Sequence, residues 1–168
     1  PFPDLPPNST LSTLPIKNRR GYLLVSTDDF HVFVPSKGLQ KTSETGNSCT
    51  FASNGGPFQK NGSCVGAVLV NGEWISRDFS GGSVGFGRTR DDWIIGPLLD
   101  ETEAADLVDF CTGFDWLVYN GVVVANQCNN TTGADRAPRT AIGVDRLGRL
   151  VLLVVDGCEL WYVTSSAL

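Results

Sequence analysis

The chain has 168 residues, of which 41% are hydrophobic, and a formal net charge of −5. This length predicts one domain with a sizeable core, and the apolar content is too high for a disordered chain at so modest a net charge. Thirteen scattered Lys and Arg residues are outnumbered by eighteen Asp and Glu residues, and no apolar run approaches about 20 residues, so neither nucleic acid binding nor a transmembrane segment is expected.

The first quarter of the chain predicts an arm followed by a hairpin. Residues 1–18 begin with several prolines and indicate an extended arm. Residues 21–38 contain two β-rich runs around Thr27, Asp28 and Asp29, which predicts a β-hairpin. The polar residues 36–48 show no hydrophobic period and indicate a loop. We therefore expect residues 1–44 to form an arm and a hairpin, and residues 45–168 to form the main part of a single domain.

Four further pairs of β-rich runs are each joined by a turn signal. These pairs cover residues 65–76, 83–96, 115–126 and 139–157. Two of the turns contain the Asn-Gly pair that favours tight hairpins, at Asn71-Gly72 and Asn120-Gly121. The other turns are predicted at residues 89–92 and 145–148.

One segment, residues 100–111, predicts a helix. Asp100 or Thr102 can cap it, acidic residues occupy its first turn, and its apolar residues fall on one face. Many strands, one helix and no regular alternation argue against a doubly wound parallel fold. The predicted class is α+β, with a predominantly antiparallel or mixed β-sheet and few helices.

Cysteines and sequons (Asn-X-Ser/Thr) indicate a secreted glycoprotein. The chain has five cysteines and no methionine, and its N-glycosylation sequons begin at Asn8, Asn61, Asn129 and Asn130. None of the cysteines forms a CxxC pair and the single His31 has no companion at ligand spacing, so no metal site is predicted. No cofactor is expected either.

The cysteine pairing is open. Cys49 and Cys64 lie on either side of a turn, where a disulfide would stabilise the fold by about 3 kcal/mol in the chain-entropy model. Cys111 and Cys128 flank a predicted strand pair and could form a bridge. Cys158 is then left over, and an odd cysteine requires its own explanation.

The turn Asn54-Gly55-Gly56 permits two interpretations. Asn and Gly accept positive φ, so the residues are explained by turn geometry alone. Alternatively, the two glycines let backbone N–H groups approach an anion while the Asn amide donates a further hydrogen bond.

Two further positions are candidates for chemistry at strand ends. Arg139, followed by Thr140, begins an apolar strand, either as an ordinary rim residue or as a clamp for phosphate or carboxylate. Asp156 ends the run LVLLVV, either as a turn residue or as a general base or charge stabiliser.

In this order, the segments resemble the phosphodiester glycosidase family. They read SNGG, NGSCVGAVLVNGEWIS, GFGRTRDDW, DWLVYNG and APRTAIGVDRLGRLVLLVVDG, and the resemblance covers residues 45–161. It implies hydrolysis of a sugar 1-phosphodiester of the N-acetylglucosamine type, in the Golgi lumen or outside the cell, in the pathway of lysosomal targeting.

The resemblance also assigns residues. It implies that Asn54, Gly55 and Gly56 line the pocket, that Arg139 with Thr140 holds the phosphodiester, and that Asp156 lies near the reacting bond. Arg90 matches a basic position of the family, and a Cys49–Cys64 disulfide agrees with its pattern.

The family pattern continues with a helix containing Leu and Trp and a strand ending in Asp-Gly-Gly-Gly-Ser-Ser. The present sequence reads CELWYVTSSAL after Gly157. We therefore expect the Asp-Gly-Gly-Gly-Ser-Ser segment to come from a further C-terminal segment or a second chain, and the 168 residues alone to be poorly stable or to associate. The alternatives to an active hydrolase are a catalytically impaired fragment, a secreted module that binds glycan or phosphate on the same scaffold, and a structural surface glycoprotein.

Overall fold

The computed structural model describes residues 9–16, 19–26, 53, 55–59, 61–80, 84–124 and 139–155. The chain forms two compact units: unit 1 comprises Pro1–Asp29 and Asp115–Leu168, and unit 2 comprises Phe30–Phe114. Unit 1 is therefore built from both ends of the sequence. The boundary predicted at residue 44 lies outside the described residues.

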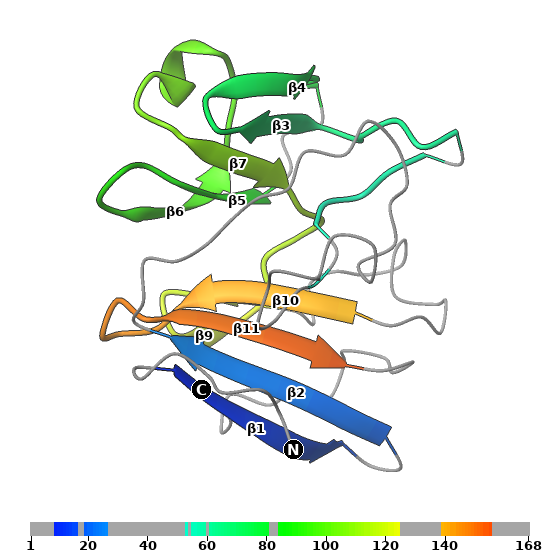
Figure 1. The fold of residues 1–168 in the computed structure, drawn as a ribbon, viewed down its shortest axis with the longest axis vertical. Helices are drawn as coiled ribbons and strands as arrows, with labels where there is room; N and C mark the ends of the chain where they lie inside the picture. Colours follow the sequence, from blue (N-terminus) through cyan, green and yellow to red (C-terminus); the bar gives the residue numbers. More distant parts are fainter. Residues whose placement is uncertain are drawn as a thin grey trace. The chain divides into compact units, whose positions relative to one another are not determined.

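Unit 1 contains a four-stranded antiparallel sheet with the strand order β1-β2-β11-β10 (Figure 1). Its strands are β1 Ser9–Ile16, β2 Arg19–Ser26, β10 Arg139–Val144 and β11 Leu150–Val155. The arm predicted for residues 1–18 is a paired strand over the range of β1. Both edges of β2 are occupied, one by β1 and the other by β11. The second run of the hairpin predicted for residues 21–38 lies outside the described residues.

A row of apolar side chains crosses this sheet. The register aligns Leu11 with Leu24, Leu24 with Leu152, and Leu152 with Ile142. Directly opposed residues share a face of an antiparallel sheet, so these four side chains support one another across the strands. Three buried residues of β11 alternate to the opposite face: Val151, Leu153 and Val155. The apolar run LVLLVV thus supplies both faces of an inner strand.

The turn between β10 and β11 confirms the hairpin predicted for residues 139–157. The Asp145 carboxylate accepts the backbone N–H groups of Leu147 at 2.8 Å and Arg149 at 3.0 Å, and the Arg149 Nε–H at 2.7 Å. The bond from the Arg149 side chain is the largest influence that lowers the pKa of Asp145. Gly148 has a φ of +75°, which glycine adopts without steric cost.

The two Asn-Gly pairs form the tight hairpins predicted from them. Asn71 and Gly72 have φ values of +50° and +77°, and Asn120 and Gly121 have φ values of +49° and +77°. Positive φ at both central residues matches the twist of the flanking strands. The first pair joins β3 Ala67–Val70 to β4 Glu73–Arg77, and the second joins β8 Val118–Tyr119 to β9 Val122–Val123.

Unit 2 contains a five-stranded sheet with the order β4-β3-β7-β5-β6, again with antiparallel pairing throughout. Its remaining strands are β5 Val84–Arg88, β6 Trp93–Pro97 and β7 Asp109–Thr112. The β5–β6 pair confirms the hairpin predicted for residues 83–96. Strand β7 is central, because β3 pairs with it on one side and β5 on the other.

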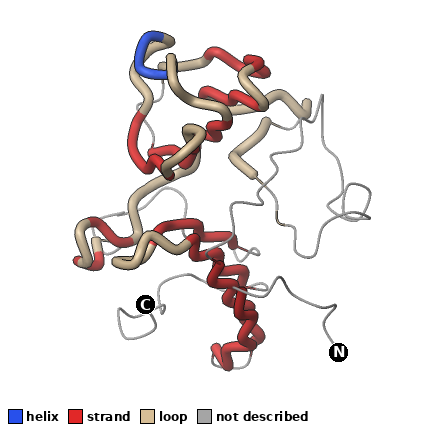
Figure 2. Tube along the Cα trace, turned by 60° about the vertical axis from the view of Figure 1, so that its left-hand side comes forward, coloured by secondary structure: helices blue, strands red, loops and turns tan. Residues whose placement is uncertain are grey.

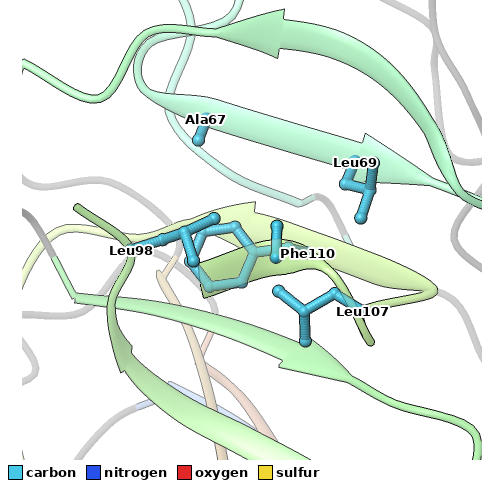
Figure 3. Close-up of a cluster of buried hydrophobic side chains, with 6 residues drawn as sticks. Ala67, Leu69, Leu98, Leu107 and Phe110 are labelled. Atoms are coloured by element: carbon cyan, nitrogen blue, oxygen red, sulfur yellow. The ribbon is translucent and has the colours of Figure 1, made fainter. Parts of the chain in front are cut away.

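The core of unit 2 is centred on Phe110, which is 1% exposed. The buried residues around it are Ala67, Leu69, Leu98, Ala104 and Leu107. In Figure 3, Leu98 lies beside the aromatic ring of Phe110. A Cβ atom on Gly85 would collide with this ring, so close packing of β5 against β7 requires glycine there.

Strand β7 also carries a fully buried carboxylate. The side chain of Asp109 is 0% exposed and accepts hydrogen bonds from the Asn71 N–H at 2.8 Å and the Arg88 Nε–H at 2.7 Å. Because a buried charge without partners costs several kcal/mol, these contacts are required. They fasten the β3–β4 turn and strand β5 to β7.

The helix predicted for residues 100–111 is wrong. Asp100 does accept the N–H groups of Thr102 at 2.8 Å and Glu103 at 3.3 Å. The element that follows is only a 3-10 turn, Thr102–Ala104, the blue segment of Figure 2, and the chain enters β7 at Asp109. Asp109 and Phe110 obtain their partners from β3 and β5, and local periodicity cannot reveal such partners.

The fold-class prediction is correct in part. Antiparallel sheet predominates, as predicted, but within the described residues the 3-10 turn is the only helical element, so the α+β assignment is not confirmed. In the same part of the chain, no helix is long and apolar enough to cross a membrane.

Candidate functional site

The glycine turn of the sequence leads directly into a small hairpin, residues 57–65, which we call the site hairpin. Phe58 forms an antiparallel bridge with Cys64, and the Val65 N–H donates to the Pro57 carbonyl at 2.9 Å. At its tip, the Asn61 carboxamide oxygen accepts the Ser63 N–H at 3.0 Å and the Ser63 hydroxyl at 2.8 Å. Asn61 is exposed there.

Gly56 is pressed against the end of β7. A Cβ atom built on Gly56 would collide with the carbonyl oxygen of Thr112 and would lie 2.9 Å from the sulfur of Cys111. A Cβ atom on Gly55 would lie 3.6 Å from the same sulfur, an ordinary contact distance. Gly55 is exposed, whereas Gly56 is half-buried. The two glycines therefore differ: packing forbids a side chain at Gly56 and permits one at Gly55.

At the other end of the site hairpin, the next residue, Gly66, also packs against Thr112. Gly66 has a φ of +82°, and a Cβ atom there would lie 2.5 Å from the Thr112 hydroxyl oxygen. Thr112 is buried, and its hydroxyl donates to the Ala67 carbonyl at 3.0 Å. Thr112 thus sets the position of the chain before and after the site hairpin.

The Cys111 thiol lies beneath the glycine turn. Burial is the largest influence and raises its pKa to about 11, the Gly56 N–H acts in the opposite direction, and the nearby Cys64 adds a further upward influence. At neutral pH the group is therefore a protonated thiol, which donates to the Thr112 carbonyl at 3.5 Å.

Among the described residues, Cys64 and Cys111 carry free thiols. The pairings considered for them, with Cys49 and with Cys128, stay predictions. Cys49, Cys128 and Cys158 lie outside the described residues.

In unit 1, strand register places the predicted site position Arg139 at the end of a hairpin. Arg139 begins β10 and pairs with Val155, the last residue of β11. Asp156 is the next residue in the sequence and lies outside the described residues. Thr140 pairs with Val154 and is half-buried. The backbone of Arg139 therefore lies at the same end of the hairpin as the point from which the chain continues into Asp156.

Within unit 2, Arg90 and the glycine turn lie near opposite ends of β7. It is exposed in the turn after β5, beyond Arg88, which pairs with Asp109 at the start of β7. Gly56 instead contacts Cys111 and Thr112 at the other end of β7. The remaining predicted site residues, Asn54 and the sequon residues Asn8, Asn129 and Asn130, lie outside the described residues.

Sequence reasoning did not identify Thr112, and it placed Cys111 on a helix. Both residues act through long-range pairing, Cys111 with Val68 and Phe86 and Thr112 with Gly85, so no local motif marks them. Among the described residues, no group of three or more His, Cys, Asp or Glu side chains could hold a metal ion.

Comparison with known proteins identifies relatives of this chain. The family model described as "Phosphodiester glycosidase" matches residues 47–165. The N-acetylglucosamine-1-phosphodiester alpha-N-acetylglucosaminidase of Bos taurus is 36% identical over 129 residues, which cover 66% of this chain and 24% of the relative. The enzyme of the same name from Homo sapiens is 35% identical over 127 residues, which cover 65% and 25%. The chain thus spans about a quarter of the length of these curated relatives.

A solved structure shares the fold. It is the zebrafish N-acetylglucosamine-1-phosphodiester alpha-N-acetylglucosaminidase catalytic domain auto-inhibited by pro-peptide. The match has a TM-score of 0.68 at 22% identity and covers 95% of this chain and 65% of the other. The family match covers well over half of the 168 residues and includes the glycine turn, the site hairpin and the β10–β11 pair. The chain belongs to the phosphodiester glycosidase family.

Proposed function

We propose that the chain is part of a hydrolase that cleaves a sugar 1-phosphodiester of the N-acetylglucosamine type and releases the sugar. The observation that carries the proposal is the register of β10 and β11. It pairs Arg139 with Val155, so the backbone of Arg139 lies at the end of the hairpin from which the chain continues to Asp156. The names of the relatives, which are 34–36% identical, support the same reaction.

In this reaction, water attacks the anomeric carbon and the bond from that carbon to the phosphate oxygen breaks. The electron pair of the bond goes to the phosphate, which leaves as a phosphomonoester, while the sugar gains a hydroxyl group. Arg139 holds the phosphate, because its planar guanidinium can donate two parallel hydrogen bonds to phosphate oxygens. The Asp156 carboxylate assists by accepting the proton of the attacking water. A phosphate leaving group reduces the need for a general acid.

The glycine turn contributes by close approach of its backbone. Gly55 is exposed and has no neighbour that forbids a side chain, so its lack of one is not explained by packing. A backbone without a Cβ atom lets a ligand oxygen come within hydrogen-bond distance of the main chain. We assign Gly55 this role, with the amide of Asn54 as an additional donor.

The test is release of N-acetylglucosamine from an N-acetylglucosamine-1-phosphodiester, with Arg139→Ala as the decisive variant. By analogy with removal of one oxyanion donor, we expect kcat to fall by about 100- to 1,000-fold. Arg139→Lys keeps the positive charge but loses the planar guanidinium. Its kcat should lie between those of the unaltered protein and the Arg139→Ala variant. Arg146→Ala is the matched control, because Arg146 is an exposed arginine in the turn of the same hairpin.

Two results would contradict the proposal. One is no sugar release by the unaltered protein, alone or with the segment that carries Asp-Gly-Gly-Gly-Ser-Ser. The other is equal activity of the Arg139→Ala and Arg146→Ala variants.

We also propose a location in the lumen of the secretory pathway, with N-glycosylation at Asn61. Its sequon occupies an exposed hairpin tip, and the Ser63 hydroxyl donates to the Asn61 carboxamide oxygen. Expressed in a eukaryotic secretory host, the protein should lose the mass of one N-glycan when Asn61→Gln is introduced, and Asn71→Gln, at a turn without a sequon, should not change it. An unchanged glycan mass in the Asn61→Gln variant would refute this site.

A further inference from the structure

The Gly55–Gly56 turn packs against the last two residues of β7, Cys111 and Thr112. The sulfur of Cys111 lies below both glycines and the carbonyl of Thr112 below Gly56. The Thr112 side chain holds the far end of the site hairpin at Gly66 and Ala67. All of these contacts lie inside unit 2.

Cys111 and Thr112 cannot move independently of the core. Phe110, the preceding residue, is 1% exposed at the centre of the hydrophobic cluster. One residue earlier, Asp109 is bound by Asn71 and Arg88. Thr112 itself pairs with Gly85, and the Gly113 N–H donates to the Val84 carbonyl at 2.8 Å. The distance between the glycine turn and β7 is therefore set by the size of the side chain at position 111.

We propose that Cys111 and Thr112 are positioning residues. They hold the Gly55–Gly56 backbone at the distance from β7 at which it binds the substrate phosphodiester. The inference rests on the proposed function and deepens it. Neither residue touches the substrate, since the glycine turn lies over both. Cys111 acts through the volume of its sulfur, and Thr112 acts through its carbonyl and its buried hydroxyl.

Two variants of Cys111 test the effect of this volume. Cys111→Ser is nearly isosteric and should retain the KM of the unaltered protein. Cys111→Val adds bulk directly beneath Gly56 and should push the turn outward. A misplacement of about 1 Å can cost 100-fold, so we expect KM for the phosphodiester to rise by about 10- to 100-fold in this variant, with a smaller change in kcat.

Leu98→Ala is the control for a merely structural effect. Leu98 is buried in the same core but is not among the neighbours of the glycine turn. Loss of folded protein lowers the apparent kcat and leaves KM unchanged, so this variant should show no rise in KM. The amide NMR signals of Gly55, Gly56 and Val65 supply a second readout without catalysis. They should shift in Cys111→Val and remain in place in Leu98→Ala.

The outcomes separate the two proposals. Complete absence of sugar release by the unaltered protein defeats the proposed function, while the amide signals still report whether position 111 sets the turn. Activity with an unchanged KM in Cys111→Val overturns the positioning role, and so do unmoved amide signals. A raised KM with shifted signals, both restored in Cys111→Ser, supports it.

Discussion

In unit 1, Arg139 is placed by strand register, whereas in unit 2 the Gly55–Gly56 turn is placed by backbone packing. The β10–β11 pair runs without a shift from Arg139 opposite Val155 to Val144 opposite Leu150. The glycine turn has no such ladder, and it is held by contacts of Gly56 with Cys111 and Thr112.

This difference predicts how each region responds to change. A register is shared by every residue pair of a hairpin, so a single substitution in β10 or in its turn should leave Arg139 in place. Close packing against one strand end has no such redundancy, because interiors transmit small changes in volume. Unit 2 should therefore show the larger effects of substitution, as three predictions specify.

The largest effect is expected for Asp109→Ala. The change leaves the half-buried Arg88 guanidinium and the Asn71 N–H without their acceptor, at a cost of about 3–5 kcal/mol in the free energy of unfolding. Urea denaturation measures this quantity. Asp91→Ala, an exposed acidic residue of the same unit, should change it by no more than about 0.5 kcal/mol.

The double variant Arg88→Met with Asp109→Leu sharpens this experiment, because it removes both partners of the ion pair. It should be much more stable than Asp109→Ala, since replacement of a buried pair by apolar residues is often neutral. A loss below about 1 kcal/mol for Asp109→Ala would show that this carboxylate does not hold unit 2 together.

The next effect separates the two glycines. Gly56→Ala drives a methyl group into the Thr112 carbonyl and should cost about 1–3 kcal/mol. Gly55→Ala meets only an ordinary contact and should change stability by less than about 1 kcal/mol. Gly55→Ala should nevertheless reduce sugar release, because its methyl group occupies the approach to the backbone. Equal stability of the two variants in thermal melts would disprove the packing argument.

The smallest effect is expected in unit 1, for Asp145→Asn. Loss of the ion pair with Arg149 should cost about 1 kcal/mol and leave KM unchanged, because β10 and β11 keep their register. The pKa of Asp145 is lowered on folding, so its contribution is present above the unfolded value and is lost as pH falls through the folded value. Below pH 4, the unaltered protein and the variant should therefore converge in stability. A constant difference down to pH 2 would contradict this assignment.

Where the prediction from sequence succeeded, the signal was local. Asn71-Gly72 and Asn120-Gly121 formed the expected hairpins, because positive φ at two successive residues is a property of the turn itself. The helix at residues 100–111 failed where the signal was not local. Asp100 accepts the N–H groups of Thr102 and Glu103, but Asp109 and Phe110 join a sheet whose other strands are distant in sequence.

The candidate site divides in the same way. The types of its residues, a glycine turn, an arginine and an aspartate at strand ends, were visible in the sequence. The packing of the glycine turn against Cys111 was not visible in the sequence, because Cys111 and Gly56 are 55 positions apart and share no motif.

The sequence alone thus determined four hairpins with their turns, and the family, since these depend on neighbouring residues and on the order of short segments. Only the tertiary structure decided that β1 and β11 enclose β2, that Asp109 is buried with two partners, and that Gly56 differs from Gly55. The physical reason is that long-range pairing and close packing depend on residues far apart in the chain, whose volumes and charges act on one another only after folding.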